Sequence, residues 1–247
     1  FLALLPIRFP RPPPLGPRAI THVLFDMDGL LLDTETCYTT AQAAVLARHG
    51  RAFTREMKAG MMGKTSLEAA AWLIGACDPP LPLSPEQLLA ERDALLADLF
   101  PSAGLMPGAA RLVSHLRACR VPAAVATSSH ARHFAAKTAA HAAFFGGFDH
   151  VVTGCQVARG KPHPDIFLAA AGKWGGGRVP PTPDRVLVFE DAPAGVRAAR
   201  AAGMAVCFVP DDRHLPEEER QATAALADVT VSSLEAWAPE DWGLAPY

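Results

Sequence analysis

The amino-acid sequence predicts an α/β protein in which a doubly wound, Rossmann-like parallel sheet carries a small, inserted α-helical cap domain. From about residue 105 onward, short apolar runs of strand length alternate with helical patterns, which is typical of parallel β-α-β units with right-handed crossovers. One more apolar run, residues 22–25, lies alone near the N-terminus and is bounded by turn-forming residues, as expected of a buried strand. Only helical patterns lie between these two regions, so the cap is predicted to follow the first strand.

Residues 36–103 show helical patterns throughout. Residues 37–50 place small and apolar side chains at helical spacing and end at Gly50, a common C-terminal cap. Residues 57–62 continue with a second helical segment. Two capping boxes, in which Ser or Thr is followed three residues later by Glu or Gln, start two further helices: Thr65 with Glu68, and Ser84 with Gln87.

Strands and helices alternate in the remainder of the chain. The predicted strands are residues 122–127, 150–153, 185–189, 205–209 and 229–231. The predicted helices are residues 108–119, 130–142, 166–171 and 193–202. We expect Asp165 to be the N-terminal cap of the helix that follows it. Because successive parallel strands run the same way, their carboxyl ends are expected to share one edge of the sheet.

Three parts of the chain follow from these patterns. We predict a Pro/Arg-rich tail at residues 1–19, an α/β core made of residues 20–35 and 104–247, and a helical cap at residues 36–103. The tail has no acidic residue, and proline this dense disfavours a stable element, so it is expected to be disordered or the remnant of a targeting peptide. The expected compartment is the cytoplasm, with a plastid or another organelle as the alternative.

Composition disfavours several classes of protein. Half of the 247 residues are hydrophobic, and the formal net charge of −2 offers no basic patch for nucleic acid. No apolar run reaches the ~18 residues of a membrane span. The five cysteines are scattered, which favours free thiols in a reducing compartment over a disulfide framework. We therefore expect a soluble protein, a monomer or weak homodimer, whose partner is a small molecule.

Two carboxylates, Asp26 and Asp28, follow the predicted strand at residues 22–25 and precede Gly29. Alternate residues start on opposite faces of a strand, but Gly29 allows a sharp turn, so that both carboxylates can bracket one ligand. An open α/β sheet binds its ligand at the carboxyl ends of its strands. The alternative interpretation is an ordinary turn, since Asp and Gly are common turn residues.

Further polar residues follow other predicted strands: Thr127 and Ser128, Lys161, and Glu190 with Asp191. In a parallel sheet these side chains can converge on one crevice. Carboxylate oxygens suit Mg²⁺, which prefers one or two carboxylates together with water and phosphate oxygens. The helix start after Thr127 offers free N–H groups to an anion, and Lys161 adds a positive charge. A phosphate group with Mg²⁺ is the ligand that accounts for the whole set.

Four motifs in this order, DMDGLLLDTE, VATSS, GKPHPDIF and VFEDAPAG, resemble the haloacid dehalogenase superfamily of aspartate-nucleophile phosphotransferases that carry a helical cap. The resemblance extends from about residue 20 to the C-terminus. Within the superfamily, MMGKTSLEAA and the ending WGLAPY are similar to glycerol-3-phosphate phosphatases of the plant kind and, nearly as much, to pseudouridine-5'-phosphatases. One loop departs from these relatives: they usually carry an acidic GDDPEV-like sequence where this chain has GCQVARGKP.

The resemblance implies a role for each motif residue. Asp26 is expected to attack phosphorus and form an aspartyl phosphate, and Asp28 to act as general acid and then as general base. Thr127 and Lys161 complete the expected catalytic set. The implied metal ligands are Asp26, Asp28 through its backbone carbonyl, Glu190 and Asp191. The implied phosphate or substrate contacts are Gly29, Thr127, Ser128, Lys161 and, in the cap, Lys64.

The expected function is therefore a Mg²⁺-dependent phosphatase for a small phosphorylated metabolite, with glycerol 3-phosphate as the first substrate expected. Pseudouridine 5'-phosphate is the second, followed by FMN and sugar phosphates. A phosphoglucomutase-type phosphotransferase uses the same residues and stays an alternative. A non-catalytic metabolite-binding protein is disfavoured because Asp26, Asp28, Lys161 and Asp191 are all present, although a fold alone never establishes a function.

Several polar residues have two interpretations. Lys64 either reaches the organic part of a substrate or is an ordinary solvated lysine. Asp33 and Glu35 either contact the substrate or cap the helix that follows them. The predicted helix at residues 130–142 carries a basic stripe, which we interpret as a solvated face in preference to a metal site: His130, His133, Lys137 and His141.

Overall fold

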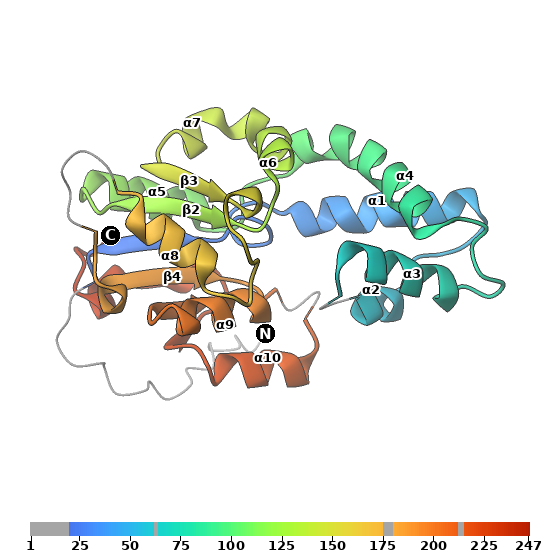
Figure 1. Ribbon diagram of the computed structural model, residues 1–247. Coiled ribbons are helices and arrows are strands. Elements are labelled where there is room, and N and C mark those ends of the chain that lie inside the picture. Colours follow the sequence, from blue (N-terminus) through green and yellow to red (C-terminus); the bar gives the residue numbers. More distant parts are fainter. Residues whose placement is uncertain (1–19, 62–63, 175–179, 212–214) are drawn as a thin grey trace, which may run out of the picture.

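A computed structural model describes residues 20–61, 64–174, 180–211 and 215–247. The prediction for the tail at residues 1–19 lies outside this part of the chain. Figure 1 shows a sheet layered with helices and, beside it, a group of helices formed by the segment between the first two strands. No helix in the described ranges is long and apolar enough to cross a membrane.

The described residues form a six-stranded parallel sheet in the order β3-β2-β1-β4-β5-β6. The strands are β1 His22–Phe25, β2 Ala123–Thr127, β3 His150–Thr153, β4 Val186–Glu190, β5 Ala205–Phe208 and β6 Val229–Thr230. The chain leaves β1 to build one half of the sheet and then returns to β1's other edge to build the second half. This reversal defines a doubly wound sheet, and ligands bind where it occurs. The predicted fold class is confirmed.

Helices cover both faces of the sheet. The bounds are α5 Ala109–Ala118, α6 Ala131–Thr138, α7 Ala142–Phe145, α8 Asp165–Gly172, α9 Pro193–Ala201 and α10 Glu217–Ala224. Neighbouring side chains of a strand point to opposite faces. Accordingly Phe25 packs in one apolar core with Leu116 of α5, whereas Leu24 packs in another with Ile166 of α8 and Val196 of α9. Strands β1, β2, β4 and β5 are therefore buried on both sides, whereas the edge strands β3 and β6 are only partly buried.

The segment after β1 forms a separately packed helical insert. Its helices are α1 Thr34–Arg48, α2 Arg55–Met61, α3 Ser66–Ala76 and α4 Pro85–Leu99. Both predicted capping boxes are present, at the starts of α3 and α4. The insert has an apolar core of its own, which includes Val45, Leu73 and Leu88. In Figure 1, α1 and α4 lie side by side and extend away from the sheet.

Two differences between the predicted and the observed helices have a local cause in the structure. Helix α1 begins at Thr34 rather than at Cys37, because the Asp33 side chain accepts a hydrogen bond from the Thr36 amide and so caps the helix earlier. The single helix predicted at residues 130–142 is interrupted by a tight turn, Ala139–His141, between α6 and α7. The ring of His141 lies 2.6 Å from the Ala103 carbonyl oxygen, so it packs against the end of the insert.

Two further features differ from the sequence interpretation. Asp165 is the first residue of α8 and forms an ion pair with Arg159 at 2.8 Å, so its predicted capping role is wrong. Helix α10 was not predicted. Its sequence, EEERQATA, is almost entirely polar and buries only Thr223, so it lacks the apolar periodicity that reveals other helices.

Candidate active site

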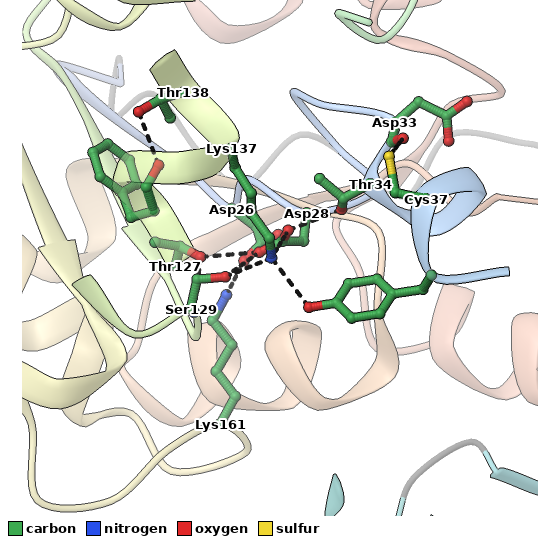
Figure 2. A network of polar contacts seen from close by, with 12 residues as sticks. Asp26, Asp28, Asp33, Thr34, Cys37, Thr127, Ser129, Lys137, Thr138 and Lys161 are labelled. Atoms are coloured by element: carbon green, nitrogen blue, oxygen red, sulfur yellow. Dashed lines mark hydrogen bonds and ion pairs between the residues drawn. The ribbon is translucent and has the colours of Figure 1, made fainter. Parts of the chain in front are cut away.

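The carboxyl ends of β1, β2 and β4 bring together the polar residues that follow them, as Figure 2 shows for the first two strands. Asp26 directly follows β1, and its amide donates to the Phe189 carbonyl of the neighbouring strand β4 at 3.0 Å. Thr127 ends β2 and Glu190 ends β4. All three side chains are buried. Residues that lie more than a hundred positions apart in the sequence therefore share one edge of the sheet.

Three carboxylates form a compact cluster at this edge. Asp26, Glu190 and Asp191 each place one oxygen atom so that all three lie within 4.8 Å of one another. Lys161 reaches into the cluster from the loop before α8. Its Nζ lies 2.5 Å from Asp26 Oδ1 and 2.5 Å from Glu190 Oε1. One lysine thus neutralises part of the charge of three acids.

The protonation behaviour of the cluster reflects burial and crowding of negative charge. Burial raises the pKa of Asp26 to about 7, with Glu190 and Asp28 adding to the rise and Lys161 opposing it. Burial, followed by the charges of Asp26 and Glu190, also holds the pKa of Asp191 well above its usual range. Burial lowers the pKa of Lys161, but its two carboxylate partners outweigh that effect and raise it overall.

A divalent cation fits this donor set. The three acids supply the hard oxygen atoms that Mg²⁺ prefers. Burial is the main cause of the raised pKa values of Asp26 and Asp191, and a bound cation would lower them, because an opposite charge nearby favours the ionised carboxylate. Asp26, Glu190 and Asp191, three of the residues expected to hold a metal, are therefore brought together.

Two glycines permit the carboxylates to approach the backbone. Gly29 has a φ of +81°, and a Cβ atom at this position would lie 2.3 Å from Asp191 Oδ2. A Cβ atom on Gly195, in α9, would lie 1.8 Å from Glu190 Oε1. Real Cβ atoms do not approach other atoms so closely, so both positions need glycine for the acids to keep their places.

Asp28 lies beside the cluster in a network of its own (Figure 2). Its Oδ1 accepts from Lys137 Nζ at 2.6 Å and from Thr34 Oγ1 at 2.8 Å. Its Oδ2 accepts from Ser129 Oγ at 2.8 Å and from Thr127 Oγ1 at 3.3 Å. Burial raises the pKa of Asp28, but the charge of Lys137 and the hydrogen bonds outweigh burial and lower the pKa overall. Asp28 is thus held as a carboxylate.

Lys137 and Ser129 are members of this network that the sequence interpretation missed. The predicted solvated stripe is wrong for Lys137, whose side chain is only 1% exposed. Its charge suggested a surface position, and no spacing in the sequence places α6 against Asp28. Ser129 had a usable signal, because it lies two residues after Thr127 in the same loop and its amide donates to Thr127 Oγ1 at 3.0 Å.

The other predicted contact residues lie further out. Ser128 and Lys64 are exposed, in the loop after β2 and just before α3, and their contacts with substrate stay predictions. Glu35, on the first turn of α1, pairs with Lys58 of α2 at 3.1 Å. Its negative charge adds to the rise in the pKa of Asp191, so Glu35 lies near the carboxylate cluster. The insert thus contributes a charged pair close to the site.

Comparisons with known proteins agree with this geometry. "(DL)-glycerol-3-phosphatase 2" of Arabidopsis thaliana is 46% identical over 94% of this chain and 95% of its own length. A "probable pseudouridine-5'-phosphatase" of Drosophila melanogaster is 44% identical over 93% of this chain and 96% of its own. The crystal structure of a hydrolase from Deinococcus radiodurans R1, with bound phosphate and sodium, is 26% identical and gives a TM-score of 0.79, covering 94% of this chain and all of that one.

The sequence also matches a family described as haloacid dehalogenase-like hydrolases over residues 20–203, which include β1 to β4 and the helical insert. This match agrees with the resemblance that the four motifs carry. It extends over most of the described core, including the ends of β1, β2 and β4 discussed above. The chain therefore belongs to the haloacid dehalogenase-like hydrolase family.

Proposed function

We propose that this hydrolase is a Mg²⁺-dependent phosphatase that cleaves a small phosphate monoester through an aspartyl phosphate on Asp26. The observation that carries the proposal is the largely buried cluster of Asp26, Glu190 and Asp191, in which Lys161 bridges Asp26 and Glu190 and beside which lies the separate carboxylate Asp28. This arrangement offers a nucleophile, a proton carrier and a cation site side by side. Relatives named as phosphatases, at 44–46% identity, support the same class of reaction.

The reaction divides between the two aspartates. A carboxylate oxygen of Asp26 attacks phosphorus while the bond from phosphorus to the ester oxygen breaks, and Asp28 gives its proton to that oxygen, which leaves as an alcohol. Asp28, now a carboxylate, takes a proton from water as the water oxygen attacks phosphorus. The bond from phosphorus to Asp26 breaks, inorganic phosphate leaves, and Asp28 holds the proton for the next cycle.

The lowered pKa of Asp28 suits the second half of this cycle, in which the residue acts as a base. The first half needs a proton on Asp28. A dianionic phosphate group beside a carboxylate raises its pKa and so favours that proton. Binding of the substrate therefore prepares Asp28 for its role as an acid.

The remaining site residues neutralise and orient the phosphoryl group. Lys161, Thr127 and the Ser128 amide would bind its oxygens, with Gly29 leaving room for them. Asp26, Glu190, Asp191 and the backbone carbonyl of Asp28 would hold Mg²⁺. When bound, the metal stabilises the negative charge of the transferring phosphoryl group.

Residues 36–103 are proposed to act as a mobile cap over the site. A closing lid excludes bulk water and limits substrates to small esters. Its hinges are expected near residues 34–36 and 102–107, where the helical insert joins the sheet. Lys64 in this cap is proposed to reach the organic part of the substrate.

Glycerol 3-phosphate is the first substrate proposed, because a relative with that activity in its name is 46% identical over nearly the full length of both chains. Pseudouridine 5'-phosphate is the second candidate, supported by the relative at 44% identity. The two esters differ greatly in the size of the leaving alcohol, so the interior of the cap is expected to distinguish them.

The test is phosphate release by the purified protein from glycerol 3-phosphate, pseudouridine 5'-phosphate, FMN and sugar phosphates, with Mg²⁺ or with a chelator. We expect one ester to be turned over with kcat/KM in the usual range of about 10⁴–10⁸ M⁻¹s⁻¹, and only with Mg²⁺. Release of phosphate from none of them would contradict the proposal. Conversion of a sugar phosphate into its isomer without phosphate release would favour the phosphotransferase instead.

A further inference from the structure

A buried lysine, Lys137, projects from α6 of the core and ends at Asp28 (Figure 2). Its side chain is 1% exposed, so the ammonium group is almost completely removed from bulk water. Its Nζ donates to Asp28 Oδ1 at 2.6 Å, to Ser129 Oγ at 2.9 Å and to Tyr38 OH at 3.3 Å. An ammonium group has three protons, so these three contacts use them all. A buried charge of this kind is costly unless it is paired, and Asp28 is its ion-pair partner.

Two aromatic rings enclose this ammonium group. Lys137 Nζ lies 4.7 Å from the ring centre of Phe100 and 5.2 Å from that of Tyr38. The two rings pack edge to face, with centres 5.6 Å apart. Tyr38 belongs to α1, and Phe100 begins the turn that follows α4, so both rings come from the insert. The negative faces of aromatic rings attract a cation, and the Tyr38 hydroxyl also accepts one of its protons, so the two residues help to hold the ammonium group beside Asp28.

The four donors to Asp28 are unequal. A carboxylate accepts about four hydrogen bonds, so Asp28 is saturated in this arrangement. Lys137 is the only charged donor among the four, and charge-assisted hydrogen bonds are the stronger kind. It binds Oδ1, together with Thr34. The longest contact of the set, 3.3 Å from Thr127, is on Oδ2. Oδ2 is therefore the oxygen that can most readily exchange a hydrogen bond for a reacting proton.

We propose that Lys137 is a positioning residue, which fixes Asp28 by its Oδ1 so that Oδ2 faces the ester oxygen and gives up the proton. This inference rests on the proposed phosphatase function. In the step concerned, the proton moves from Asp28 Oδ2 to the ester oxygen as the bond from that oxygen to phosphorus breaks and the bond from Asp26 to phosphorus forms. Lys137 itself exchanges no proton and does not touch the substrate.

The test compares two leaving groups in the variant Lys137→Met, which keeps an unbranched side chain only one heavy atom shorter and removes its charge. An alkyl ester, glycerol 3-phosphate in the first instance, needs protonation of its leaving oxygen, whereas p-nitrophenyl phosphate releases a stable anion without it. We expect kcat/KM to fall about 100-fold for the alkyl ester, as for loss of general acid catalysis, and less than about 10-fold for the aryl ester.

Two further variants make the comparison specific. Lys173→Met is the matched control, because this lysine is exposed and its Nζ bonds only a backbone carbonyl among the contacts described for it, that of Val151 at 3.3 Å. Lys173→Met should leave kcat/KM unchanged for both esters. Tyr38→Phe removes one hydrogen bond to Lys137 and keeps the ring. It should therefore lower kcat/KM more for the alkyl ester than for the aryl ester, as Lys137→Met does, but by a smaller factor. This variant decides the question if Lys137→Met does not fold.

The outcomes separate the inference from the function on which it rests. If wild type hydrolyses neither ester, the proposed function fails. If wild type hydrolyses both, and Lys137→Met or Tyr38→Phe lowers kcat/KM by equal factors for the two esters, the function stands but Lys137 is merely structural. A selective fall in kcat/KM for the alkyl ester supports the positioning of Asp28 by Lys137.

Discussion

Gly29 shows how a single residue shapes the site. Its φ of +81° is unfavourable for other residues, and a Cβ atom there would lie 2.3 Å from Asp191 Oδ2. The Gly29→Ala variant is therefore expected both to destabilise the protein, by about 1 kcal/mol or more, and to displace Asp191. Activity at limiting Mg²⁺ should fall sharply, which a magnesium titration of phosphate release measures.

Gly50 provides the matched control for this substitution. It also has a positive φ, +66°, but a Cβ atom added there would meet nothing within 4 Å. Gly50→Ala should therefore cost a similar free energy of unfolding from backbone strain while leaving the magnesium titration unchanged. Equal effects of the two variants on activity would show that the approach of Asp191 to Gly29 is unimportant.

Single residues also mark the limit of prediction from this sequence. Most of the site could be found because its residues follow a strand or lie in a recognisable motif: Asp26, Asp28, Thr127, Lys161, Glu190 and Asp191. The sequence places Lys137 on a solvated helix face because it shares a polar stripe with three histidines, and lysines are almost never buried unless paired. Its partner, Asp28, lies 109 positions away, and the fold brings them together by placing α6, after β2, beside the loop that follows β1.

Helix α4 shows how local sequence determines an element. Ser84 accepts from the Gln87 amide at 3.2 Å, and the Gln87 side chain accepts from the Ser84 amide at 2.8 Å. Ser84→Ala removes the first of these bonds and should lower the free energy of unfolding by about 1 kcal/mol, measured by urea titration. Ser84 lies at the start of α4 and is not one of the site residues. We therefore expect kcat to stay as in wild type.

Ser233 is the comparison for that helix cap. It also precedes a helical turn, Leu234–Ala236, but its side chain makes no capping hydrogen bond. Ser233→Ala should therefore change stability by less than Ser84→Ala. Equal losses would indicate that the effect comes from serine replacement in general.

Element boundaries were predictable where a local signal exists and not elsewhere. The capping boxes of α3 and α4 identified both helix starts, and β1 and β3 have the predicted bounds. Helix α10 has no apolar stripe, and the break between α6 and α7 occurs where His141 reaches the Ala103 carbonyl. These two features depend on tertiary contacts that a single sequence does not reveal.

The whole molecule combines a parallel sheet with a helical insert, and the two meet at one site. The strand order β3-β2-β1-β4-β5-β6 places the ends of β1, β2 and β4 next to each other, which explains why motifs spread along the chain converge. This convergence was predictable, because alternating strands and helices imply a parallel sheet. The sequence predicts that the insert is a cap and that its Lys64 contacts the substrate. The structure adds that Thr34 and Tyr38 of α1 belong to the network around Asp28.

The central claim is that Asp26 becomes phosphorylated during turnover, and acid quenching tests it most directly. Wild-type protein is mixed with the preferred ester, labelled in its phosphoryl group, in the presence of Mg²⁺, and the quenched protein is digested and the labelled peptide identified. We predict label on Asp26 in wild type, and neither label nor phosphate release in Asp26→Asn, which preserves the shape of the side chain. Label on a different residue, or undiminished turnover by Asp26→Asn, would contradict the account.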